Sequence, residues 1–375
     1  MEKIQFIDLA AQQQRIKPAL EEKISAVLNH GQYIMGPEVK ELETKLSAFG
    51  NTKHALSCSN GSDAIFLALL ALEIGPGDAV FVPSFTFAAT AEMVALTGAS
   101  PVFIDVLDNT FNMDPAHLQS AINETKAQGA LTPKAVMAVD LFGQIANYPQ
   151  IAKITKSENL ALIADAAQGF GATLGKTQAG DYADIVTTSF FPAKPLGTYG
   201  DGGAVLTNSD ELNDILISLR NHGQGQDRYD NVRIGINGRL DSLQAAILLL
   251  KLEIFPSEIE QRNEIANRYT QALSDHVIPP YVLDHTISTW AQYTIRTPKR
   301  DKIAADLREQ NIPTAIYYAK PLHVQTAYKH YPQGGGALPI TEKLATDVIS
   351  LPMHPYLKPA VQDKIISAVK QALDD

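Results

Sequence analysis

The chain has 375 residues, 45% of them hydrophobic and 19% charged, which is the composition of a compact globular protein and a length that suits one large domain with a smaller one. Its net charge of −10 argues against binding to nucleic acid or to an anionic membrane surface, but it does not exclude a small anionic ligand at a local site. The single cysteine, Cys58, cannot form an internal disulfide, so nothing suggests an oxidising compartment. The start of the chain is unlike a signal peptide, and the most apolar run is too short to span a bilayer. We therefore expect a soluble, cytoplasmic protein.

The first part of the chain alternates short apolar runs with helical segments. Helices are expected over 63–75 and 87–99. Strands are expected over 55–59, 79–83, 101–106, 134–143, 160–165, 184–190 and 203–208. This alternation predicts an α/β domain built around a mostly parallel, mixed sheet flanked by helices. In such sheets ligands bind at the carboxyl ends of the strands.

The second part of the chain begins with a long helical pattern, 240–273, which contains Pro256, where a break or kink is expected. Beyond it we expect a smaller α+β unit. Its predicted elements are strands over 290–297 and 312–318 and helices over 301–311 and 363–373. The predicted domains are residues 1–250, a large domain with an N-terminal arm, and residues 251–375, a small C-terminal domain.

The segment SCSNGSDAI, residues 57–65, joins a predicted strand to a predicted helix. Gly61 permits a tight turn, and Ser62 and Asp63 fall in the first helical turn. Free backbone N–H groups at a helix start form an anion site, to which a serine hydroxyl adds a donor. Plain capping of the helix by Ser62 is the commoner explanation for this segment taken alone.

Asp165 directly follows a continuous apolar strand, and Gln168 comes shortly after it. A carboxylate at the end of a buried strand needs a partner. It either caps the following turn, which is the usual explanation, or holds the protonated ring nitrogen of a cofactor.

Lys194 lies in the segment SFFPAKPLG, where a lysine is ordinarily exposed in a loop. Here Pro192 and Pro195 stiffen the backbone, and Phe190 and Phe191 offer an apolar wall. Burial would lower the pKa of the lysine and leave a neutral amine able to attack a carbonyl group.

An anion site, an acid and a lysine therefore occur in chain order at successive strand ends. Together they correspond to the groups that hold pyridoxal 5′-phosphate (PLP): a helix start for the phosphate, a carboxylate for the ring nitrogen and an amine for the aldehyde.

Seven motifs carry a family resemblance over nearly the whole chain. They are GQYIMGPEVKELE, SNGSDAI, PSFTFAAT, DAAQGFGA, SFFPAKPLGTYGDGGA, GINGRLDSLQAAILL and PTAIYYAKPLH. With them the chain resembles the DegT/DnrJ/EryC1/StrS family of nucleotide-sugar aminotransferases. The resemblance implies the PLP-dependent transferase fold of type I, like that of aspartate aminotransferase.

The resemblance also implies roles for single residues around the cofactor. Lys194 matches the lysine that forms a Schiff base with PLP, and Asp165 matches the partner of the ring nitrogen. Phe87 matches the aromatic residue that stacks on the ring, although a core phenylalanine is an equal alternative. The remaining matches around the ring edge and phosphate are Gln168, Gly61, Ser62, Asp63 and Ser189.

Other matches point to a second subunit and to the substrate. Asn237 matches a phosphate ligand donated by the neighbouring subunit of a homodimer, whereas the residue alone suggests a turn asparagine. Arg239, Tyr317 and His323 match positions near the nucleotide-sugar. For His323 a structural hydrogen bond in a loop is almost equally expected. No metal is expected.

The implied reaction moves an amino group from L-glutamate to a UDP-linked keto-sugar, at C3 of a 3-oxo-N-acetylglucosaminuronic acid used for bacterial surface polysaccharide such as O-antigen. Related enzymes that catalyse dehydration carry histidine at the position of Lys194, so lysine favours amino transfer. An aminotransferase acting on C4, or on C3 of another UDP- or dTDP-keto-hexose, remains an alternative. A non-catalytic regulatory or binding protein on the same fold is the alternative of another class.

Overall fold

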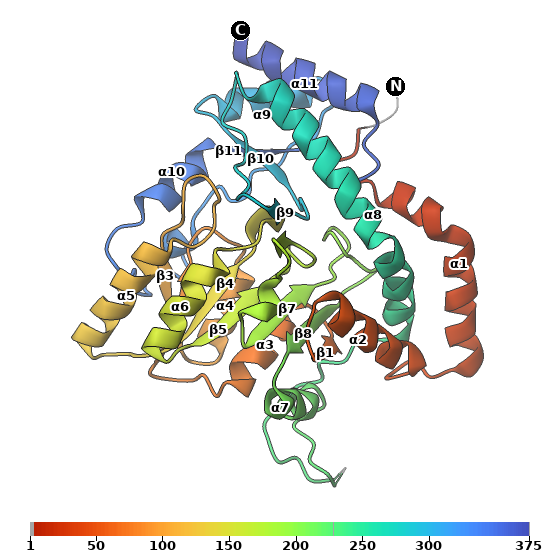
Figure 1. Cartoon of the computed structure of the whole chain (residues 1–375), viewed down its shortest axis with the longest axis vertical. Coiled ribbons are helices and arrows are strands. Elements are labelled where there is room, and N and C mark those ends of the chain that lie inside the picture. Colours follow the sequence, from red (N-terminus) through yellow and green to blue (C-terminus); the bar gives the residue numbers. More distant parts are fainter. Residues whose placement is uncertain (1–3, 228, 375) are drawn as a thin grey trace.

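The computed structural model describes residues 4–227 and 229–374, and its centre is a seven-stranded sheet (Figure 1). In spatial order the strands are β1 (His54–Cys58), β8 (Gly203–Thr207), β7 (Ile185–Ser189), β5 (Ala161–Asp165), β4 (Thr132–Val139), β2 (Asp78–Pro83) and β3 (Ser100–Ile104). Only β8 runs antiparallel to its neighbours. The predicted mostly parallel, mixed sheet is therefore confirmed.

Helices cover both faces of this sheet, because its strands are buried on both sides and read as continuous apolar runs. The core of one face includes side chains of α2 (Pro37–Phe49), α5 (Pro115–Gln128), α6 (Tyr148–Glu158) and the first part of α8 (Ser242–Leu273). The core of the other face includes side chains of α3 (Gly61–Ala71), α4 (Ala89–Leu96) and α7 (Asp210–Arg220). This layered arrangement confirms the predicted α/β fold.

Helix α8 runs without interruption through Pro256, so a break there is wrong, and a kink, the other expectation, stays a prediction. Its first part packs on the large core through Leu248, Leu249 and Phe255, and its last part packs on the C-terminal core. Helix α1 (Leu9–His30) packs along it (Figure 1). Burial on these sides outweighs the roughly 3 kcal/mol that an interior proline costs a helix.

The C-terminal part forms a smaller α+β unit, as expected. Its pair of antiparallel strands, β10 (Tyr293–Arg296) and β11 (Val348–Leu351), packs with α9 (Arg300–Glu309), α11 (Pro359–Asp374) and the end of α8. The strand expected over 312–318 is wrong, because this segment makes only an isolated bridge between Ala315 and Ser350. Pro313 lacks the N–H that a longer ladder would need. The predicted boundary at 250/251 falls inside α8 and stays a prediction.

The remaining elements are short. They are β6 (Thr173–Leu174), which pairs with β9 (Thr286–Ile287), helix α10 (Pro339–Asp347), and the 3₁₀ turns η1 (Leu141–Gly143), η2 (Ala179–Asp181) and η3 (Leu322–Val324).

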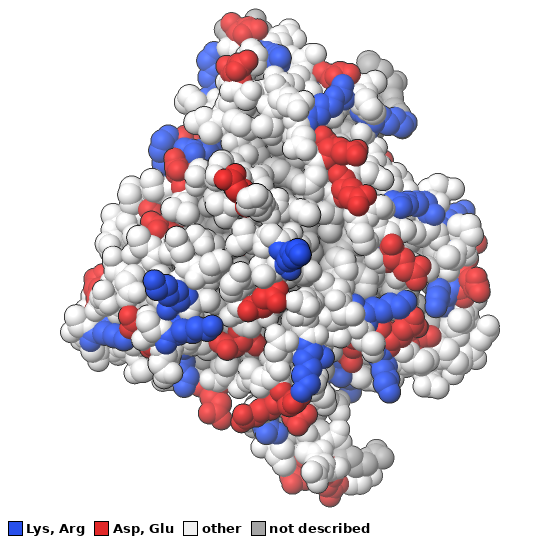
Figure 2. All heavy atoms as spheres, in the orientation of Figure 1, with Lys and Arg blue, Asp and Glu red and all other residues white. Residues whose placement is uncertain are grey.

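Strands β1, β2, β4, β5 and β7 point the same way, so their carboxyl ends meet at one edge of the sheet. The segments that follow these ends carry the predicted site residues. On the face shown in Figure 2, acidic and basic side chains are interspersed. No helix within the described part of the chain is long and apolar enough to cross a membrane.

Candidate active site

Lys194 lies in the loop that follows β7, where its backbone N–H donates to the Phe191 carbonyl oxygen at 2.8 Å. The residue is half-buried. Burial lowers the pKa of Lys194 below its ordinary value, and the negative charge of Asp165 opposes this shift. Of the two flanking rings, Phe190 is buried in the core and Phe191 is mostly exposed, so the predicted wall of two rings is wrong. The amine is nevertheless desolvated, as expected.

Asp165 ends β5 and both of its carboxylate oxygens accept hydrogen bonds. Thr90 Oγ1 donates to Oδ2 at 3.0 Å, and the Ala167 N–H donates to Oδ1 at 3.1 Å. Burial raises the pKa of Asp165, while the Ala167 N–H and the charge of Lys194 act in the opposite direction. One oxygen thus caps the turn, as the usual explanation holds. The mutual electrostatic effect places Asp165 and Lys194 in one site.

Asp140 is a second buried carboxyl beside Asp165, and the sequence analysis missed it. It follows β4, the strand next to β5, and its N–H donates to the Asp165 carbonyl oxygen at 3.0 Å. Its Oδ1 accepts from the Ala146 N–H and from Tyr148 Oη, both at 2.8 Å. Burial raises the pKa of Asp140 to about 7, and the charge of Asp165 adds to the shift. The available signal was an aspartate directly after an apolar strand, the same pattern that drew attention to Asp165.

Asp140→Asn is expected to change how stability depends on pH. The folded-state pKa, about 7, lies above the ordinary value of 3.8. Between these values the unfolded chain releases the proton and the folded protein keeps it, so this group makes the wild type less stable as pH rises. The variant lacks that loss. Measured by calorimetry without cofactor, the midpoint of the variant relative to wild type should rise by about 1–3 °C from about pH 5 to about pH 8. A difference independent of pH would contradict this assignment.

Gln168 is fully hydrogen-bonded within the protein. Its Oε1 accepts from the Phe142 N–H at 2.7 Å, and its Nε2 donates to Tyr318 Oη at 3.1 Å. Hydrogen bonds within the protein therefore engage both ends of the amide. Tyr318 reaches Gln168, whereas the predicted Tyr317 packs its ring against Phe6. The sequence offered two adjacent tyrosines and no means of choosing between them.

Phe87 is 57% exposed, so it is not a core phenylalanine. Its ring centroid lies 6.5 Å from that of Tyr318, at an interplanar angle of 40°. An exposed aromatic ring at the carboxyl edge of a sheet offers a flat apolar face to a ligand.

We expect the anion cradle at the start of α3, where the capping residue is Asn60 and not Ser62. Asn60 Oδ1 accepts from the Asp63 N–H at 2.8 Å. The Asp63 carboxylate accepts from Asn60 Nδ2 at 2.9 Å and from the Ser59 hydroxyl. The donors that remain available to an anion at the start of α3 are therefore the Ser62 side chain and the first N–H groups of the helix.

Gly61 brings this helix start against the end of β7. A Cβ atom on Gly61 would lie 2.5 Å from Ser189 Cβ, so a larger residue would push the two segments apart. Ser189 thus borders the same cradle as Ser62. No group of three or more metal-ligating side chains occurs among the residues that the structure describes. A helix start, an acid, a desolvated amine and an exposed ring at one sheet edge fit the phosphate, ring nitrogen, aldehyde and ring face of PLP.

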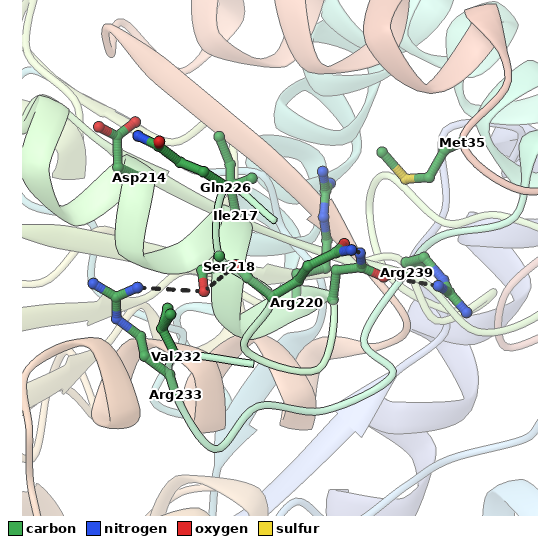
Figure 3. Close-up of a pocket in the computed structure, with 12 residues that line it drawn as sticks. Met35, Asp214, Ile217, Ser218, Arg220, Gln226, Val232, Arg233 and Arg239 are labelled. Atoms are coloured by element: carbon green, nitrogen blue, oxygen red, sulfur yellow. Dashed lines mark hydrogen bonds between the residues drawn. The ribbon is translucent and has the colours of Figure 1, made fainter. Parts of the chain in front are cut away.

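Asn237 and Arg239 flank Gly238, whose carbonyl oxygen accepts from the Ser59 N–H at 3.1 Å, just before the start of α3. Asn237 is exposed and forms a bridge with Asn221, whose Oδ1 accepts from Arg239 at 2.8 Å. Arg239 lines a cavity of about 760 Å³ together with Arg220 and Arg233 (Figure 3). Its Nε is buried without a hydrogen-bond partner among the described residues. Neither Lys194 nor Asp165 lines this cavity.

His323 is buried and bonded through both ring nitrogens. Ser84 Oγ lies 2.7 Å from Nδ1, and Glu342 Oε1 lies 3.3 Å from Nε2. These contacts agree with the structural alternative for this histidine.

Comparison with known proteins identifies an aminotransferase family, in agreement with a site whose residues fit PLP. The model of the DegT/DnrJ/EryC1/StrS aminotransferase family matches residues 14–370. The UDP-2-acetamido-2-deoxy-3-oxo-D-glucuronate aminotransferase of Pseudomonas aeruginosa is 46% identical over 97% of this chain and 99% of its own. A pleiotropic regulatory protein of Geobacillus stearothermophilus is 41% identical over 98% of each chain.

Solved structures agree as well. A DegT/DnrJ/EryC1/StrS aminotransferase from Brucella abortus matches with a TM-score of 0.98 and 51% identity, over 99% of this chain and 100% of that one. NtdA of Bacillus subtilis, solved with the cofactor PMP, matches with a TM-score of 0.90 and 28% identity, over 100% of this chain and 86% of that one. The chain therefore belongs to the DegT/DnrJ/EryC1/StrS family of PLP-dependent aminotransferases.

Proposed function

We propose that this enzyme transfers the amino group of L-glutamate to C3 of UDP-2-acetamido-2-deoxy-3-oxo-D-glucuronate, in the synthesis of a bacterial surface polysaccharide such as O-antigen. The substrate follows from the 46% identity, over nearly the full length of both chains, to the aminotransferase of that name. The single structural observation that supports the chemistry is the desolvated amine of Lys194 within the field of Asp165. The predicted cytoplasmic location stays a prediction.

The surroundings of each residue suggest its role in the proposed reaction. When bound, PLP supplies an aldehyde that reacts with amines and a ring that withdraws electrons from the reacting carbon. Lys194 takes the proton from Cα of glutamate on its Nζ, because its lowered pKa leaves a share of the amine neutral. Asp165 holds the proton on the ring nitrogen. Phe87 packs on the ring, and Ser62 and the first N–H groups of α3 bind the phosphate.

Further hydroxyl and cationic groups complete the proposed site. Ser189 adds a donor to the phosphate, since it borders Gly61. Arg239 binds a substrate anion, either the uronate or the diphosphate, because its guanidinium carries an unused buried donor. Gln168 is proposed to contact the edge of the cofactor ring and His323 to lie near the nucleotide-sugar, with Tyr318 and Ser84 bonded to their side chains.

We propose that the enzyme is a homodimer in which Asn237 of one chain completes the cofactor site of the other chain. The segment of residues 221–227 and 229–237 projects from the body beyond α7 in Figure 1. It carries Val232, 54% exposed, and Ile234, 92% exposed, which are unusual on a free surface. A second copy covering this segment would carry Asn237 to the cofactor phosphate of its partner. If analytical ultracentrifugation showed a monomer under conditions in which the enzyme is fully active, this arrangement would be excluded.

The substrate is tested by supplying the purified enzyme, PLP and L-glutamate with three compounds in parallel: the UDP-3-oxo-glucuronate, a UDP-4-keto-hexose and a dTDP-4-keto-hexose. We expect 2-oxoglutarate and an amino sugar from the first compound. Turnover of a 4-keto sugar in preference to it would show that another carbon faces the cofactor. Equal, slow turnover of all three would assign a different sugar.

The regulatory alternative is favoured by the names of two relatives, the pleiotropic regulatory protein at 41% identity and a sensory transduction protein of Saccharopolyspora erythraea at 34% identity. L-glutamate alone distinguishes the two functions. An aminotransferase converts the yellow PLP form to the colourless PMP form within one half-reaction, whereas a binding protein that has lost the chemistry keeps its colour.

A further inference from the structure

The loop that carries Lys194 is folded tightly on itself. The Phe190 N–H donates to the Gly202 carbonyl oxygen at 2.7 Å, and the Thr198 N–H donates to the Phe190 carbonyl oxygen at 2.8 Å. At Gly197 an added Cβ would lie only 2.6 Å from the carbonyl oxygens of Phe191 and Pro192. The backbone around Lys194 therefore has a defined position, provided that something holds the far side of the loop.

Helix α8 contacts the far side of the loop at three consecutive loop residues, Gly197, Thr198 and Tyr199. Gln244 Oε1 accepts from Thr198 Oγ1 at 2.5 Å and from the Tyr199 N–H at 3.2 Å. Lys251 Nζ donates to the Gly197 carbonyl oxygen at 2.6 Å and lies 4.0 Å from the centre of the Tyr199 ring. Residues 244 and 251 are seven apart, about two turns, so they share one face of the helix.

Lys251 is an unusual residue for this position, because its side chain is completely buried. Burial lowers the pKa of Lys251 to about 8, and the charge of Glu258 opposes the shift. Burying a cation is costly, and an apolar side chain of similar length often fills such a position with equal or greater stability. The carbonyl and the aromatic face compensate only part of this cost. What the amine adds that an apolar side chain lacks is a directional bond to Gly197.

We propose that Lys251, together with Gln244, is a positioning residue that fixes the Lys194 loop from behind and thereby sets the place and the desolvation of the reactive amine. This inference deepens the proposed function, since it rests on the role of Lys194. Gln244 and Lys251 lie on one face of α8, and they bind residues three to five positions beyond Lys194. A displacement of about 1 Å at a reacting group is enough to cost up to about 100-fold in rate.

The test is Lys251→Met, which keeps the length of the side chain and removes the amine. In the full chain without cofactor, acetylation of Lys194 by acetic anhydride is followed against pH by peptide mass spectrometry. We expect the midpoint to rise by about 0.5–1 pH unit, because a loosened loop admits water to the amine. In the holoenzyme, kcat for glutamate should fall about 3- to 10-fold with KM changed less than about twofold.

Two further variants make the result decisive. Leu252→Ala removes a neighbouring core side chain of α8 and should lower thermal stability without moving the Lys194 midpoint. Lys251→Arg keeps a cationic donor and should recover part of kcat. If Lys251→Met does not fold, Gln244→Leu cuts the other anchor and should shift the midpoint in the same direction.

The proposal is overturned if Lys251→Met leaves both the Lys194 midpoint and kcat at wild-type values, or if Leu252→Ala shifts the midpoint equally. Because the acetylation is measured on the cofactor-free chain, it decides the role of Lys251 even if the keto-sugar proves to be a different one.

Discussion

Lys194→Ala is expected to reduce turnover by at least about 1,000-fold and to abolish covalent attachment of PLP to the chain. The variant loses both the amine that joins the aldehyde and the base that moves the proton at Cα. It also leaves Asp165 without the positive charge that lowers its pKa, so that carboxyl becomes harder to ionise. Mass spectrometry after borohydride reduction measures attachment, and 2-oxoglutarate release measures turnover.

Lys194→Arg separates the charge from the chemistry. A guanidinium stays protonated at any pH at which the protein is folded, so it neither joins the aldehyde nor accepts a proton. This variant should be as inactive as the alanine variant, although it keeps a positive charge beside Asp165. The matched control is Lys176→Ala, an exposed lysine in the turn after β6, which should behave as wild type. Glutamate-dependent turnover by Lys194→Ala at a wild-type rate would assign the chemistry to another residue.

The fold could be predicted from the sequence because its strands are buried on both faces. Runs such as residues 79–83 and 160–165 are continuously apolar, and the observed β2 and β5 lie within one residue of these limits. The same reasoning failed where tertiary packing outweighs local preference. Pro256 does not end α8, because side chains on both sides of it are held in two cores.

The candidate site was predictable only where a residue follows a strand end in the sequence. Lys194, Asp165 and Ser62 could be found in this way, because parallel strands place such residues at one edge. Tyr318 and Lys251 could not, since their partners lie 150 and 54 positions away along the chain. The capping residue was misassigned because Asn60 and Ser62 are both good caps, and only the backbone geometry shows where α3 begins.

Asp165→Asn is expected to retain PLP binding and to lose at least about 100-fold in kcat. The amide can keep the local structure: its oxygen still accepts from the Ala167 N–H, and its nitrogen can donate to Thr90 Oγ1. It carries no negative charge, however, so it does not stabilise a proton on the ring nitrogen, and the ring becomes a weaker electron acceptor. Single-turnover kinetics with glutamate measures this loss apart from product release.

Thr90→Val provides the matched control for Asp165→Asn, because it removes a hydrogen bond to the carboxylate and leaves the charge in place. A hydrogen bond to a charged group contributes about 1.5–3 kcal/mol, but this bond is made both before and during the reaction and Ala167 still holds the other oxygen. Only part of that free energy is therefore lost from the transition state, and we expect a loss of no more than about tenfold in kcat. The ordering of the two variants is therefore the informative result. If Thr90→Val were as slow as Asp165→Asn, the orientation of the carboxyl group would matter and its charge would not. If Asp165→Asn turned over at the wild-type rate, the ring nitrogen would need no anionic partner, and Asp165 would serve only to cap the turn after β5.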